Sequence, residues 1–130
     1  MTVDTHSAQK RAGQIAVQVK NLCDDLEERL KYLPSPKNDE EFLSEIISLL
    51  AWFQHRLVWI HPFKDYNGRI ARLLTNLLAL NLNLPVLEIK AGTGRDRERY
   101  IKAMKAADEQ DYSKLEKLIA NALKESLETV

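Results

Sequence analysis

The chain has 130 residues, 45% of them hydrophobic, as in one ordinary globular domain, so we expect residues 1–130 to fold as a single unit. Nineteen basic and nineteen acidic side chains give a formal net charge of zero, which excludes global attraction to nucleic acid or to an anionic membrane. The most apolar stretch, 46–60, is interrupted by Gln54, His55 and Arg56 and is shorter than the ~20 apolar residues that span a bilayer. The N-terminus lacks the apolar core of a signal peptide, so the sequence predicts a cytoplasmic protein without a membrane partner.

The first predicted element is an amphipathic helix. Residues 1–12 are expected to be a flexible N-terminal segment, and from Ala12 to Leu30 apolar side chains recur every three or four residues. Residues 13–19 also partly alternate between apolar and polar, so a remnant of a β-hairpin is the alternative there, although the helical spacing fits better. Cys23 is the only cysteine and cannot form an internal disulfide, and we expect a buried free thiol.

A second helix is predicted to begin at Asn38, because Glu41 lies three residues further on, as in a capping box. Its apolar surface is so broad that we expect other helices to surround it. The helix ends before the pair His61-Pro62, because proline disfavours helical geometry in the residue that precedes it.

Three further helices are predicted from apolar positions three or four residues apart. Ser113 and Glu116 have the spacing of a capping box at the start of the last one. Residues 86–89 form a short extended connector. This order of elements, without repeats or a linker, predicts an all-α helical bundle. The three predicted helices span residues 69–82, about 97–108 and about 113–127.

Chemically versatile residues concentrate in 61–72, HPFKDYNGRIAR, between two apolar helices. Gly68 allows close approach of a ligand to the backbone, and the free N–H groups of the following helix N-terminus favour an anion. Arg69 and Arg72 lie three residues apart in the first helical turn, where two guanidinium groups suit a polyphosphate. The segment therefore predicts a site for phosphates.

Two other residues of this segment suit group transfer. His61 has an ordinary pKa near neutrality and can accept a proton from a nucleophile. Asp65 supplies a hard oxygen ligand for Mg²⁺, an ion that bridges substrate phosphates. Together with the phosphate site, these groups suit transfer of a phosphate-linked group to a hydroxyl.

The segment resembles the Fic motif, His-x-Phe-x-Asp/Glu-Gly-Asn-Gly-Arg-x-x-Arg, and its flanking helices are similar too, over roughly residues 42–123. The resemblance implies a Fic-like helical bundle. It also implies a protein adenylyltransferase that uses ATP and Mg²⁺, transfers AMP to a Ser, Thr or Tyr hydroxyl of a target protein, and releases pyrophosphate. The residues that match the motif are His61, Phe63, Asp65, Asn67, Gly68, Arg69 and Arg72.

The resemblance assigns a role to each matching residue. It implies that His61 is the catalytic general base, that Phe63 is a buried anchor of the loop, and that Asp65 holds Mg²⁺. Asn67 and Gly68 would form the anion hole, with the two arginines on the outer phosphates. The implied nucleotide-binding residues are thus Asn67, Gly68, Arg69 and Arg72.

Tyr66 occupies a position where the family usually has glycine. A tyrosine is costly there if the backbone needs a positive φ or close contact with a phosphate. The Doc-type branch also has another residue at this position and transfers a phosphate instead of AMP. A Doc-like phosphotransferase and a non-catalytic, nucleotide-responsive interaction module are therefore the alternatives to AMP transfer.

Regulatory features of the family are missing from this sequence. Many Fic proteins carry a Ser/Thr-x-x-x-Glu-Gly/Asn motif whose glutamate pairs with the second motif arginine, here Arg72, and no segment has that pattern. Restraint would then come from a partner chain such as an antitoxin, from sequence missing here, or not at all. The family's β-hairpin flap is expected to be short or missing, and a homo-oligomer is compatible with the sequence.

Three further features of the sequence lie outside the motif. His55 lies six residues before His61, which is not the spacing of a metal pair, and is interpreted as structural. Tyr100 is interpreted either as core or as a neighbour of the nucleotide base. The basic residues of 90–105 are interspersed with acidic ones and lack an aromatic ladder, so nucleic acid is not the expected partner.

Overall fold

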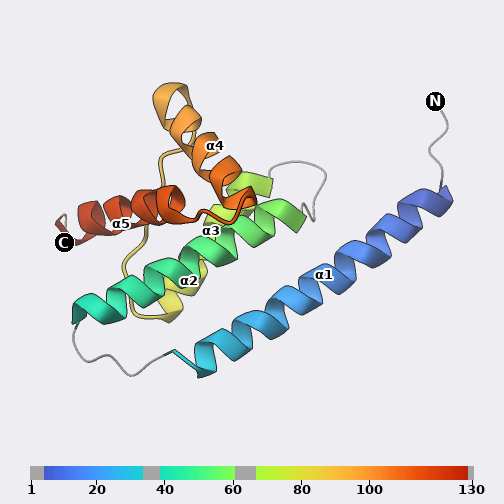
Figure 1. Ribbon diagram of the computed structural model, residues 1–130, viewed down its shortest axis with the longest axis horizontal. Helices are drawn as coiled ribbons and strands as arrows, with labels where there is room; N and C mark the ends of the chain where they lie inside the picture. Colours follow the sequence, from blue (N-terminus) through green and yellow to red (C-terminus); the bar gives the residue numbers. More distant parts are fainter. Residues whose placement is uncertain (1–4, 34–38, 61–66, 129–130) are drawn as a thin grey trace.

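The computed structural model describes residues 5–33, 39–60 and 67–128. Within these ranges it contains five helices and no strand, which confirms the predicted all-α bundle (Figure 1). None of the described helices is long and apolar enough to cross a membrane. The helices are α1 Thr5–Lys31, α2 Asp39–Ile60, α3 Asn67–Asn81, α4 Gly94–Asp108 and α5 Ser113–Glu128.

Helix α2 is the centre of the molecule and packs against each of the other four helices. Its side chains Ile46 and Leu50 have no exposed surface, and the core formed around them contains buried residues from each of the other four helices. The breadth of the apolar surface in the sequence predicted this central position, and the prediction is confirmed. Because α2 is central, a side chain on its inner faces can reach α3, α4 and α5.

Among the described helices, α1 packs on α2 alone, and Figure 1 shows its N-terminal turns extending past the other helices. It begins at Thr5, so residues 5–12, which the sequence assigned to a flexible segment, continue the helix, and their flexibility stays a prediction. Residues 13–19 are helical as well, which decides against a hairpin in that region.

Cys23 is exposed, so the expectation of a buried thiol was also wrong. The neighbouring Leu22 faces the core and is only 4% exposed. Because each residue advances a helix by about 100°, the side chain that follows a core-facing leucine points away from α2.

Helix α3 ends in a Schellman motif. Asn83 has a φ of 65°, its N–H donates to the carbonyl of Leu80, and the N–H of Leu84 donates to the carbonyl of Ala79 at 2.9 Å. Asparagine tolerates this left-handed conformation better than most residues do. The motif directs the chain back along α3, so that Leu87 is buried in the core.

The connector that was expected to be extended runs beside α3. The carboxamide of Asn76 accepts from the N–H of Leu87 at 2.6 Å and donates to its carbonyl at 2.9 Å. This pair of bonds satisfies the backbone of a non-helical segment where a neighbouring strand would otherwise do so.

The predicted capping box of α5 is not formed. Ser113 is the first helical residue, and its N–H and hydroxyl both donate to Oδ1 of Asp111, at 3.1 and 2.6 Å. The N–H of Glu116 donates to the carbonyl of Tyr112 instead of to the serine side chain. An aspartate two residues before the helix thus takes the capping role, because the tight turn after α4 brings its carboxylate over the first turn.

Candidate functional site

The motif lies only partly within the part of the chain that the structure describes. His61, Phe63, Asp65 and Tyr66 lie outside the described residues, so their implied roles stay predictions. Asn67 is the first residue of α3, so the helix begins two residues before its predicted start at residue 69. The motif residues whose side chains or surroundings the structure describes are Gly68, Arg69 and Arg72.

The side chain of Arg72 folds back over the first turn of α3. A Cβ atom built on Gly68 would lie 3.1 Å from Nη1 of Arg72. Only a glycine therefore leaves the guanidinium this close to the backbone without a shift. The positive charge of Arg72 then adds to the positive end of the helix dipole and to the free N–H groups of the same turn. This arrangement attracts an anion such as a phosphate.

Arg72 also contacts an aromatic ring from another helix. Its Cζ lies 5.1 Å from the ring centroid of Tyr100 on α4, within the range of a cation–π interaction. The Tyr100 side chain is buried, and its hydroxyl donates to Oε1 of Gln54 on α2 at 2.9 Å. Arg72 is thus fixed between its own helix turn and a ring that is itself anchored to the central helix.

Burial raises the pKa of Tyr100, and the hydrogen bond and charge of Arg72 lower it by less. The phenol therefore stays protonated at neutral pH and keeps its bond to Gln54. The sequence left Tyr100 open between core and nucleotide neighbour, and the structure places it in the core and in contact with Arg72.

Sequence reasoning missed the role of Gln54. This residue is completely buried, and its Nε2 has no hydrogen-bond partner among the described residues. The available signal was its polarity, because a carboxamide in the most apolar stretch of the chain needs polar partners to be buried. Its bond to Tyr100 therefore connects α2 with α4.

His55 has the structural surroundings that the sequence suggested. It is buried, its Nε2 lies 2.8 Å from Oδ1 of Asp108 at the end of α4, and its ring stands edge-on to Tyr112 at 5.5 Å. These contacts connect α2 with the turn between α4 and α5. No group of three or more metal-ligating side chains occurs within the described ranges, and Asp65 lies outside them.

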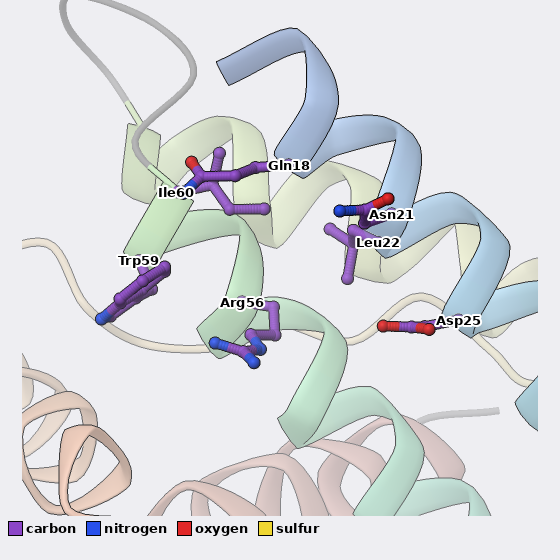
Figure 2. A pocket seen from close by; sticks show the side chains of 7 residues that line it. All are labelled: Gln18, Asn21, Leu22, Asp25, Arg56, Trp59 and Ile60. Atoms are coloured by element: carbon purple, nitrogen blue, oxygen red, sulfur yellow. The ribbon is translucent and has the colours of Figure 1, made fainter. Parts of the chain in front are cut away.

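A groove of about 230 Å³ between α1 and α2 ends next to the motif. Figure 2 shows the carboxamides of Gln18 and Asn21 on one wall and Arg56 and Trp59 on the other. The Arg56 guanidinium lies 5.3 Å from the Trp59 ring, so this arginine is also stacked on an aromatic side chain. Ile60, at the end of the groove, directly precedes the motif in the chain.

Comparison with known proteins gives consistent results. The Fic/DOC family model matches residues 3–79, more than half of the chain, including the motif. The chain is 33% identical over 97 residues to a Fido domain-containing protein of Dictyostelium discoideum, covering 71% of this chain and 62% of that protein. It is 31% identical over 90 residues to protein adenylyltransferase Fic of Culex quinquefasciatus, covering 69% and 17%. It is 30% identical over 105 residues to the Aedes aegypti protein of that name, and the match covers 80% of this chain and 20% of that protein.

The chain thus spans about three fifths of the Dictyostelium relative and about a fifth of the mosquito relatives. No solved structure matches it.

Proposed function

The chain belongs to the Fic/DOC family, and from this premise we propose that it is a protein adenylyltransferase, which transfers AMP from Mg²⁺-bound ATP to a Ser, Thr or Tyr hydroxyl of a target protein. The observation that carries the proposal is the match of seven motif positions in register, ending in the second turn of α3. The names of the mosquito relatives support it.

The first turn of α3 binds the phosphates in this proposal. Because Gly68 has no Cβ, the Arg72 guanidinium lies close to the backbone N–H groups of this turn, and Arg72 contributes charge from a position fixed by the ring of Tyr100. Arg69 lies in the same turn and is exposed, where it can contact an outer phosphate. A cation that is already held in place needs no reorganisation during the reaction, which strengthens its effect on the transition state.

The chemical step belongs to the motif residues that precede α3 in the sequence. His61 takes the proton of the target hydroxyl, and the hydroxyl oxygen forms a bond to the α-phosphorus as the bond to the bridging oxygen breaks. Pyrophosphate leaves, and AMP remains on the target. Asp65 is the proposed ligand of Mg²⁺, which neutralises phosphate charge when bound.

Labelled nucleotides test the proposal. Purified protein is incubated with α-labelled ATP, Mg²⁺ and cell lysate, and labelled proteins are resolved on a gel. We expect labelled bands with the wild type, none with His61→Ala, and wild-type labelling with the matched variant His6→Ala. Equal labelling by wild type and His61→Ala would contradict the proposal.

Tyr66 favours a second candidate, because the family usually has glycine at this position. If the phenol ring displaces the α-phosphate, the protein either transfers the γ-phosphate or binds nucleotide without turnover. Labelling from γ-labelled ATP alone would indicate phosphate transfer. Calorimetric binding of Mg²⁺·ATP without any labelling, together with AMP transfer by Tyr66→Gly, would indicate an interaction module.

A further inference from the structure

A second cationic feature of the molecule lies between α4 and α5, which pack against each other (Figure 1). A groove of about 410 Å³ runs between them, and no acidic side chain of the described residues lines it. Four of its six lining residues carry a positive charge. The lining residues are Arg99, Lys102, Lys114, Lys117, Leu118 and Asn121.

The charges of this α4–α5 groove are only partly compensated, since Asp111 interacts with Lys114 and the acidic residues Glu88, Asp96 and Glu125 line an adjacent hollow that shares Arg99, within the described part of the chain. None of its four cations forms an ion pair there, whereas Lys20, Lys31 and Lys90 pair with carboxylates at 3.5, 3.7 and 3.8 Å. The chain as a whole carries equal numbers of acidic and basic residues. The positive potential is therefore local, and four like charges around one hollow repel each other until an anion enters it.

We propose that the α4–α5 groove binds an acidic peptide segment of a partner protein. Carboxylates carry the opposite charge to the lysine ammonium groups and the Arg99 guanidinium, and they accept the hydrogen bonds that these groups donate. The half-buried Leu118 offers an apolar surface to the methylene groups of glutamate, and the exposed Asn121 carboxamide can bond to a peptide backbone. In the ranges that the structure describes, no aromatic side chain lines the groove, so they offer no surface there on which nucleic acid bases could stack.

The groove is separate from the phosphate site. Tyr100 points into the core toward Gln54, whereas its neighbours Arg99 and Ile101 are exposed. Variants in the groove therefore leave the contacts of Arg72 unchanged. The proposal stands whether or not the protein transfers AMP.

The test measures binding of a fluorescein-labelled, glutamate-rich peptide by fluorescence anisotropy at low salt. A peptide of equal length with glutamine in place of glutamate serves as the uncharged control. We expect saturable binding of the glutamate peptide only, and about tenfold or greater weakening in Lys102→Glu and in Lys117→Glu, because each reversal replaces an attraction by a repulsion. Lys20→Glu on α1 is the matched control and should weaken binding by less than about twofold.

Four outcomes would overturn the proposal. Equal weakening by Lys20→Glu and Lys117→Glu, or no binding at all, would remove the groove as the site. Tighter binding of oligouridylate than of the peptide, lost in the same variants, would assign the groove to nucleic acid. A wild-type dimer in light scattering that Lys117→Glu dissociates would assign it to a second copy. Lys117→Gln, checked by circular dichroism, removes the charge without repulsion and guards against loss of folding.

Discussion

The first turn of α3 and the α4–α5 groove both present positive charge, but they hold it differently. In the first, the guanidinium of Arg72 rests against Gly68 and on the buried ring of Tyr100. In the second, Arg99, Lys102 and two lysines of α5 are exposed and form no ion pair within the described residues.

This difference teaches what each region can select. A cation in one fixed position favours a ligand of defined geometry, such as a phosphate at a helix N-terminus. Exposed cations on long, mobile side chains select charge rather than shape, and their attraction weakens as salt concentration rises. This comparison requires that the contacts with Gly68 and Tyr100 hold the Arg72 guanidinium in one position.

The largest expected effect is the loss of the held cation itself. Arg72→Ala should weaken Mg²⁺·ATP binding by about ten- to hundredfold, because hydrogen bonds to charged groups contribute about 1.5–3 kcal/mol each. Arg56→Ala is a matched control, since Arg56 also lies on an aromatic ring, that of Trp59. Isothermal titration calorimetry measures both affinities. Equal losses in the two variants would mean that general positive charge, rather than the place of Arg72, attracts the nucleotide.

A smaller effect is expected from the anchor of the ring. Tyr100→Phe removes the bond to Gln54 and leaves a completely buried carboxamide with its Oε1 unpaired as well. The free energy of unfolding, measured with urea, should fall by about 1–3 kcal/mol. Tyr32→Phe alters a tyrosine that is 78% exposed, and should change it by less than about 0.5 kcal/mol. Similar values for both variants would show that the ring is not anchored through its hydroxyl.

Gly68→Ala is expected to weaken the free energy of Mg²⁺·ATP binding by about 1 kcal/mol or less. Gly68→Ala places a Cβ 3.1 Å from Nη1 of Arg72, so the guanidinium must shift. We expect Mg²⁺·ATP affinity to fall about three- to fivefold, since displaced charge loses part of its interaction with the phosphates. Gly13→Ala in α1 meets nothing within 4 Å and should stabilise the protein by about 0.5–1 kcal/mol without changing affinity. An unchanged affinity in Gly68→Ala would argue against a fixed Arg72.

The smallest expected effect is a change in the free energy of unfolding at alkaline pH. Because burial raises the pKa of Tyr100 in the folded protein, its contribution is fully present below the ordinary pKa of 10.0 and is lost as pH rises through the higher folded value. Unfolding free energies of wild type and Tyr100→Phe should therefore converge above pH 10.0, and differ by a constant amount at lower pH. A constant difference through the alkaline range would contradict this.

Local spacing predicted most of the fold, since the period of apolar residues depends only on which helix face is buried. The predictions that were wrong concerned the surroundings of two individual side chains. Cys23 follows a core-facing leucine, and Ser113 loses its capping role to Asp111, a residue placed by the turn after α4. Both depend on neighbours that spacing alone does not reveal.

The candidate site divides in the same way. The order of the chain alone places Gly68 and Arg72 in one helical turn, so sequence reasoning could find them. The partnership of Gln54 with Tyr100 joins residues 46 positions apart and depends on how α2 and α4 pack. No spacing rule connects them, although a buried carboxamide in an apolar stretch was a visible signal.

The most direct test of the central claim is a crystal structure with a non-hydrolysable ATP analogue and Mg²⁺. The account predicts that the phosphates accept hydrogen bonds from backbone N–H groups in the first turn of α3 and from Arg72, with the α-phosphorus facing His61. Phosphates bound elsewhere, for instance among the cations of the α4–α5 groove, with Arg72 still against the Tyr100 ring and no ligand beside it, would contradict the account.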